Sequence, residues 1–233
     1  MAQTTLEKIH IPASIDELPK HPNIGFEKFV EAVGSGRLSP GTTLTQAQLC
    51  DFLDVSLSPL RESLVLLEEY GLIEIKQRSG ITIINPELSF VRENYQFRIL
   101  IEIEALRAFV ANVPDGWLAA VRDRHKSVMA AIDKGKRDME AIEAFVALDQ
   151  FVHSSLVKAL GNKSILSTHN RLQQNIRMVR AMQGTTAYEN NLLEAGREHL
   201  ELFERIEVGD LEGASRCLRR HFESSIYRAV VFP

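Results

Sequence analysis

The chain has 233 residues, 45% of them hydrophobic and 25% charged, and a formal net charge of −4. Its length allows two modest domains with separate cores, and no run approaches the roughly 20 apolar residues of a membrane helix. The first 20 residues lack a signal peptide pattern and Cys50 and Cys217 form no C-x-x-C pair, so we expect a cytoplasmic protein without a disulfide framework.

Residues 1–22 contain three prolines and no sustained period, which predicts an extended N-terminal arm. From Ile24 to Val33, apolar residues recur at helical spacing until Gly34 and Gly36 end the pattern. A first helix is therefore expected here, followed by a turn at Leu38–Gly41 that contains proline and glycine.

Two further short helices follow. Thr45 and Gln48 form a capping-box pattern at the start of a helix that ends near Asp54. Ser58 followed by Pro59 predicts the start of the next helix, with Ser58 as the cap and Pro59 in the first helical position. Two helices joined by a tight turn are typical of a helix-turn-helix motif.

The β-branched runs Leu72–Lys76 and Ile81–Ile84 flank a polar turn and predict a hairpin, which completes a winged helix over residues 23–85. Six basic and eight acidic residues between Lys20 and Asn85 do not make the basic surface typical of DNA-binding domains. Phosphate contacts are local, however, and candidate positions lie at the helix starts, the turn and the wing. We expect DNA contacts from Arg37, Thr45, Ser58, Arg61 and Arg78. Use of the winged helix for protein contacts remains the alternative.

The segments Gly36–Leu44, Gln48–Ser56, Ser58–Leu64 and Glu69–Ile73 resemble the signature of GntR-type regulators. The resemblance covers about sixty residues and implies a transcription factor that binds DNA. One position departs from the family pattern. Leu57 stands where members usually carry an arginine that reaches DNA, so that contact is lost.

Residues 86–233 show helical patterns only, with short breaks, and predict an antiparallel all-helical bundle. The chain is thus expected to be mostly α, an N-terminal winged helix-turn-helix followed by this bundle. The predicted helices span Leu88–Asn112, Gly116–Lys134, Asp138–Leu160, Lys163–Met182, Glu189–Val208 and Leu211–Val230.

Four residues of the bundle form a candidate metal site. Asp149 and His153 are four residues apart and share a helix face. His199 and His221 lie at nearly equal distances on either side of the turn at Gly209, which would place them side by side. Imidazole and carboxylate ligands favour zinc, with nickel or manganese as alternatives. The other reading is that each histidine is an independent core or surface residue. His125 and His169 have no such partners and are left out.

The bundle also resembles the FCD ligand-binding domain of FadR-like GntR regulators. The matching residues are Arg98, Glu102, Asp149–His153, Gly161-Asn162, Glu198-His199, Gly209-Asp210 and His221-Phe222. The resemblance implies that Asp149, His153, His199 and His221 hold a divalent ion and that a small organic acid completes its coordination. Arg98 and Arg177 are the candidate effector-binding residues, although Arg98 could instead pair with Glu102 at i,i+4.

These features together predict a homodimeric regulator, expected to be a repressor, on a palindromic operator. A carboxylate effector bound at the metal would control its operator affinity. The alternative is an all-helical metal-dependent hydrolase that uses the same aspartate and histidines. No nucleophile motif, adjacent His-Asp pair or second carboxylate cluster supports catalysis, so no catalytic residue is expected.

Overall fold

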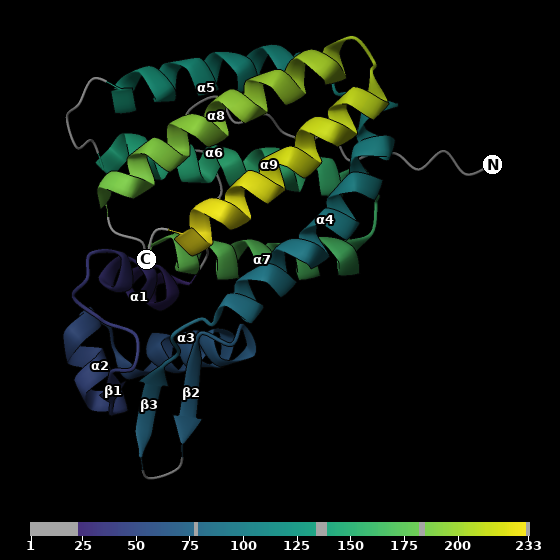
Figure 1. Ribbon diagram of the computed structural model, residues 1–233. Helices are drawn as coiled ribbons and strands as arrows, with labels where there is room; N and C mark the ends of the chain where they lie inside the picture. Colours follow the sequence, from purple (N-terminus) through teal and green to yellow (C-terminus); the bar gives the residue numbers. More distant parts are fainter. Residues whose placement is uncertain (1–22, 77–78, 134–138, 182–184, 232–233) are drawn as a thin grey trace.

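The computed structural model describes residues 23–76, 79–133, 139–181 and 185–231. Within these ranges the chain forms nine helices and one three-stranded sheet (Figure 1). Helices α1 to α3 and the sheet form the lower part in this view, and α4 to α9 form the upper part. No helix in the described ranges combines the length and apolar character needed to cross a membrane. The predicted arm, residues 1–22, lies outside the described residues.

The N-terminal part begins with α1 (Ile24–Gly34), α2 (Gln46–Leu53) and α3 (Leu57–Glu69). The capping box at Thr45 is present, with Gln48 as its second member. The predicted cap at Ser58 is wrong, because α3 starts at Leu57, two residues before Pro59, and is preceded by Ser56 as N-cap. Pro59 then occupies the third helical position, where its missing N–H still removes no intrahelical hydrogen bond.

The wing consists of β2 (Ile73–Lys76) and β3 (Gly80–Ile83), paired antiparallel with Ile75 opposite Ile81. The sheet has a third strand that the sequence patterns did not predict. This strand, β1 (Thr43–Leu44), pairs with β3 on the side away from β2. Two residues are too short to show a β period, so only the tertiary pairing reveals the strand.

The upper part is a bundle of six helices. The predicted helices are present, but α8 starts at Thr185 rather than at Glu189, four residues earlier. The six helices of the bundle are α4 (Leu88–Val110), α5 (Trp117–Asp133), α6 (Met139–Lys158), α7 (Lys163–Ala181), α8 (Thr185–Glu207) and α9 (Leu211–Val231). Helix α9 packs between α8 and α4, and α6 packs against α4, α5 and α7 (Figure 1).

Two main hydrophobic cores hold these parts together. The lower core is formed by α1, α2, α3 and the sheet, around fully buried residues such as Phe26, Phe29 and Leu60. It also includes Met178, which comes from α7 of the upper part. The upper core is centred on side chains such as Phe109, Trp117 and Phe203. The mostly α class, with a winged helix before an all-helical bundle, is therefore confirmed, whereas the boundary at residue 85 stays a prediction.

Candidate metal centre

Three helices bring the four predicted ligands together. Helix α6 carries Asp149 and His153 one turn apart, α8 carries His199 and α9 carries His221. Gly209 joins α8 and α9 with a backbone φ of 68°, in the left-handed region where glycine has no steric penalty. The chain reverses there, so the two histidines meet at the same level of the antiparallel pair.

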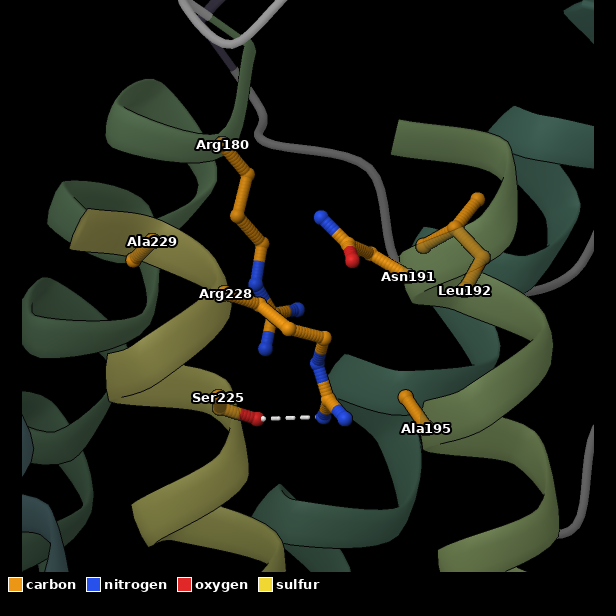
Figure 2. A pocket seen from close by; sticks show the side chains of 7 residues that line it. All are labelled: Arg180, Asn191, Leu192, Ala195, Ser225, Arg228 and Ala229. Carbon is orange, nitrogen blue, oxygen red and sulfur yellow. Dashed lines mark hydrogen bonds between the residues drawn. The ribbon is translucent and has the colours of Figure 1, made fainter. Parts of the chain in front are cut away.

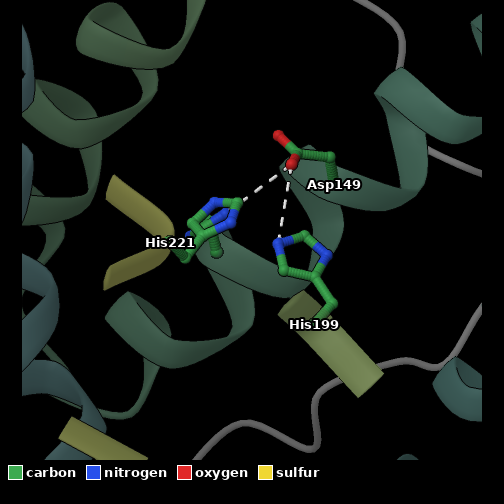
Figure 3. Close-up of side chains that lie close together, drawn as sticks. Asp149, His199 and His221 are labelled. Carbon is green, nitrogen blue, oxygen red and sulfur yellow. Dashed lines mark ion pairs between the residues drawn. The ribbon is translucent and has the colours of Figure 1, made fainter. Parts of the chain in front are cut away.

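The four side chains are buried and converge on one point. One ligand atom of each lies within 4.8 Å of the corresponding atoms of the other three. Asp149 Oδ1 is 3.7 Å from His153 Nε2. It is also 3.7 Å from His199 Nε2 (Figure 3). Ligands on opposite sides of an ion that is about 2.1 Å from each would be about 4.2 Å apart. The cluster therefore has nearly the size that one coordinated ion requires.

Each histidine is oriented by a hydrogen bond from its Nδ1–H. His153 donates to Glu102 Oε2 (2.5 Å) and His221 donates to Glu198 Oε2 (2.7 Å). His199 Nδ1 lies 2.9 Å from His125 Nε2. His125 donates its own Nδ1–H to the carbonyl of Val121 at 2.7 Å, so its Nε2 is left as an acceptor for His199.

This arrangement leaves a free lone pair on Nε2 of all three ligand histidines. Asp149 Oδ1 and the three Nε2 atoms are buried and have no hydrogen-bond partner among the described residues. Four unpaired acceptors at one point would destabilise a metal-free core, since buried polar atoms normally find partners. A divalent ion pairs with all four at once, and Nδ1–H donation to an acceptor is the usual support for a metal-bound histidine. The residues therefore fit a metal ion.

The charge state of the cluster suits metal binding as well. Burial alone would raise the pKa of the Asp149 carboxyl, but Arg180 and the three imidazoles lower it far below its usual range. Burial lowers the pKa of His221 to about 4, against the opposing effect of its hydrogen bond to Glu198. Burial and the neighbouring His221 also lower the pKa of His199. An ionised carboxylate and neutral imidazoles are the forms that bind a cation.

A second layer around the ligands includes two histidines that the sequence analysis left out. His125 supports His199, and His169 Nε2 lies 2.7 Å from Glu102 Oε1. Each occupies the apolar face of its helix: His125 continues the stripe of Val121, Val128 and Ile132. This apolar stripe is visible in the sequence, and it could have predicted that His125 is buried and therefore has a hydrogen-bond partner.

Glu102 lies at the centre of this layer. It accepts hydrogen bonds from His153 and Arg98, whose Nε donates at 2.8 Å. Burial would raise the pKa of this carboxyl, but Arg98, His153 and His169 lower it well below its ordinary value. The i,i+4 pair of Arg98 with Glu102 is thus formed. Arg98 Nη2 nevertheless stays buried with no partner in the described part of the chain, so one donor remains for a ligand.

Two more arginines reach the centre, and sequence reasoning missed both. Arg180 donates to Asp149 Oδ2 at 3.3 Å. Arg228 donates from both terminal nitrogens to Glu198, at 2.9 Å each. Burial would raise the pKa of Glu198, but its bonds to Arg228 and His221 lower it to about 2. Arg228 lies thirty residues from Glu198, so no local pattern links them.

The structure does not bring Arg177 to the centre. Both of its terminal nitrogens donate to the carboxylate of Glu27 in α1, at 2.7 and 2.6 Å. Arg177 therefore forms a contact between the bundle and the winged helix, and its predicted effector role stays a prediction. Spacing on α7 could not reveal this, because the partner is 150 residues away in the chain.

Four of the five candidate DNA-contacting residues lie in the described part, and all four are exposed. Arg61 of α3 lies near Gln46 of α2, with Nε 3.5 Å from its side-chain oxygen. The side chain of Thr45 takes part in the capping box of α2, and Ser58 lies in the first turn of α3. Arg37 stacks over Phe52, with 5.7 Å between its guanidinium carbon and the ring centroid. Arg78 lies outside the described residues. Leu57, at the arginine position of the resembled signature, is exposed at the start of α3.

Comparison with known proteins assigns both parts of this architecture. A winged helix joined to an all-helical domain is the architecture of a class of DNA-binding transcriptional regulators. Residues 26–83 match the model for bacterial regulatory proteins of the gntR family, and residues 93–224 match the FCD domain. The chain therefore belongs to the GntR family and carries an FCD domain. Members of this family bind operator DNA, often as dimers.

Individual relatives agree with this assignment. The chain is 26% identical to the uncharacterized HTH-type transcriptional regulator YdhC of Bacillus subtilis, over 84% of this chain and 85% of YdhC. It is 23% identical to the HTH-type transcriptional repressor RspR of Escherichia coli, over 80% and 78% of the two chains. The solved structure of E. coli McbR/YncC has a similar fold, with a TM-score of 0.70, 19% identity and coverage of 88% and 94%. YdhC and RspR carry the names of transcriptional regulators.

The hydrogen bond from His221 to Glu198 gives a first testable prediction. Glu198→Ala removes the acceptor that orients His221, so we expect zinc affinity to fall by about 10- to 100-fold. Competition with a chromophoric chelator measures this affinity. The matched control is Glu194→Ala, one turn earlier on α8, where the exposed carboxylate pairs only with Arg197 among the described residues. Equal zinc affinity in the two variants would contradict the role of Glu198.

Proposed function

We propose that this protein is a transcriptional repressor whose operator affinity is controlled by a small organic acid bound at a divalent metal ion. The ion is held by Asp149, His153, His199 and His221, and zinc is the expected ion. The main support is the convergence of four buried, unpaired ligand atoms on one point. The name of RspR, a repressor, supports the sign of regulation.

The effector is expected to bind beside the ion and to contact Arg98. This arginine is almost fully buried, is fixed by Glu102 and stacks on Phe222 with 5.0 Å between its guanidinium carbon and the ring centroid. Its unpaired Nη2 is a charged donor in a site shielded from solvent. A carboxylate is the natural partner for such a donor, because charge-assisted hydrogen bonds are the stronger class.

Helix α7 is our candidate for the connection between the two parts. Toward the metal centre, His169 contacts Glu102 and Arg180 contacts Asp149. Toward the winged helix, Arg177 binds Glu27 and Met178 is buried in the lower core. We propose that ligand binding shifts α7 and with it α1. A switch of this kind requires that the ligand binds with different affinities to the two states of the protein, which differ in the position of α7.

DNA binding is assigned to α3, to the wing and to the residues around them. A homodimer would present two such surfaces to the half-sites of a palindromic operator. Arg37, Thr45, Ser58, Arg61 and Arg78 are the proposed contacts. Because Leu57 offers no charge, we expect an operator that differs from those of relatives with arginine at this position. A protein with this role acts in the cytoplasm, where the operator is.

The metal assignment predicts that His199→Ala combined with His221→Ala abolishes both metal content and metal-dependent DNA binding. The double variant keeps at most two of four ligands, too few to retain the ion. Elemental analysis of protein purified without chelator measures metal content, and circular dichroism checks folding. The control is Glu194→Ala, which should keep the wild-type metal stoichiometry. Stoichiometric metal in the folded double variant would refute the ligand assignment.

The assignment of α3 to DNA binding predicts that Arg61→Ala weakens operator binding by about tenfold. The slope of log affinity against log salt concentration should fall by about one, because one phosphate contact is lost. Operator DNA is obtained by selection from a random duplex library with the wild-type protein, and fluorescence anisotropy measures affinity at several salt concentrations. Arg197→Ala, an exposed change on α8 of the bundle, is the matched control. An unchanged affinity and salt slope for Arg61→Ala would count against this role of α3.

The α7 connection predicts that Glu27→Gln uncouples DNA binding from the metal centre. We expect wild-type zinc affinity, since Glu27 lies in α1, but a smaller difference in operator affinity between zinc-loaded and chelator-treated protein. Allosteric couplings change an affinity by about 5- to 150-fold. The ratio of the operator affinities of zinc-loaded and chelator-treated protein should therefore be less than about a third of the wild-type ratio in Glu27→Gln.

The matched control for this uncoupling is Glu69→Gln. Glu69 also faces α7, but its contact with Arg171 is exposed and 4.0 Å long, so little coupling should be lost. Equal zinc responses in Glu27→Gln and wild type would exclude the Arg177–Glu27 contact as the connection.

A further inference from the structure

Helix α4 carries a row of exposed side chains on the side that faces away from the bundle. Its other side packs against α6, α7 and α9, and α4 runs along one edge of the bundle (Figure 1). The exposed residues, which we call the α4 row, are Glu93, Phe97, Leu100, Glu104 and Arg107. Successive members are four, three, four and three residues apart. This is the heptad spacing, which keeps side chains on one line of a helix.

The middle of the α4 row is apolar. Leu100 is 73% exposed and Phe97, one turn earlier, is 44% exposed. The neighbouring Ile101 and Ile103 are only partly buried and widen this apolar surface. A single exposed leucine needs no explanation, but a contiguous apolar group bordered by charged residues is typical of an interaction surface.

The two ends of the α4 row carry opposite charges. Glu93 and Arg107 each lie seven residues from Leu100, which is about 10.5 Å along the helix axis in opposite directions. Neither forms an ion pair with another described residue. If two copies of α4 pack antiparallel with Leu100 at the crossing point, Glu93 of each copy lies beside Arg107 of the other. The row is therefore complementary to itself, as an interface across a two-fold axis requires.

Another open part of the bundle has a different character. Between α7, α8 and α9 lies a small hollow into which Arg180, Asn191 and Arg228 point (Figure 2). Covering such a hollow with a protein surface would remove charged groups from water, which is costly unless the partner pairs with them. The fully buried centre of a protein interface is apolar and poor in charge. The α4 row meets that description, and the hollow does not.

We propose that the α4 row binds the same row of a second copy of this chain, antiparallel and with the two-fold axis at Leu100. This inference rests on the homodimer of the proposed function and assigns its interface. Phe97 and Leu100 would form the apolar centre. Two symmetric pairs of Glu93 with Arg107 of the partner subunit would fix the register, because complementary charges select one arrangement over its alternatives.

The place of α4 in the chain connects this interface to operator binding. Ile83 ends β3 and Leu88 begins α4, so this helix leads directly out of the wing. A pair of α4 helices would therefore set the distance between two winged helices, on which the spacing of operator half-sites depends. The buried side of the same helix supports the metal centre through Arg98 and Glu102. Helix α4 thus contacts the metal centre, the wing and the proposed partner.

The variant Leu100→Glu tests the centre of the interface. It brings two carboxylates together across the two-fold axis, so dimer affinity should fall by at least about thirtyfold, the loss typical of a central contact residue. Sedimentation velocity of zinc-loaded protein over a concentration series measures dimer dissociation, and circular dichroism checks folding. The control is Val208→Glu at the end of α8, because Val208 is also 73% exposed and should dimerise as wild type after the same change. A dimer as tight in Leu100→Glu as in wild type would overturn the proposal.

Exchange of the two end charges tests the antiparallel register. Glu93→Arg and Arg107→Glu each turn two attractive pairs per dimer into contacts between like charges, so each should weaken the dimer by about fivefold or more. The double variant restores both pairs in reversed order and should dimerise within about twofold of wild type. Single variants as tight as wild type, or a double variant no tighter than the single ones, would refute the pairing.

The same measurements separate this inference from the function on which it rests. If wild-type protein is a dimer that none of the α4 variants weakens, the homodimeric regulator stands and the proposed interface fails. If wild-type protein stays monomeric at the concentrations at which it binds operator DNA, both fail.

Discussion

A buried histidine that donates its Nδ1–H can offer only Nε2 to a further partner, and three histidines of this protein are held in that state. Glu102, Glu198 and His125 accept the three Nδ1–H bonds. The remaining Nε2 atoms and one oxygen of Asp149 then face one another with no hydrogen-bond partner among the described residues. Lone pairs crowded in this way repel, so the bundle gains stability from any cation that binds them. The packing of α4, α6, α8 and α9 is thereby tied to a ligand.

Helix α7 makes contacts with both the metal centre and the DNA-binding part. Helix α7 contacts the carboxylates of the centre on one side and α1 on the other, with Arg177, Met178 and Arg180 within four consecutive positions. Successive residues of a helix point in different directions, about 100° apart, so neighbours in sequence can serve opposite surfaces. A small movement of α7 is therefore felt by both parts, which is what a sensor with distant input and output sites requires.

Much of this could be predicted from sequence because the signals were local. The capping box at Thr45, the i,i+4 pair of Asp149 and His153, and the spacing of His199 and His221 around Gly209 each depend on helix geometry alone. The supporting layer depends on tertiary contacts. Arg228 reaches Glu198 and Arg177 reaches Glu27 across the fold, and no periodicity encodes those pairs. The start of α3 was misplaced because Ser56 and Ser58 are both good caps and proline is tolerated throughout the first turn.

The most direct test of the central claim is anomalous X-ray scattering from crystals of the zinc-loaded protein, measured on both sides of the zinc absorption edge. Ligation of one zinc ion by the four side chains predicts one strong anomalous peak per chain, within about 2.0–2.2 Å of Asp149 Oδ1 and of the Nε2 atoms of His153, His199 and His221. A peak elsewhere, or no peak at this position in a fully loaded crystal, would contradict it.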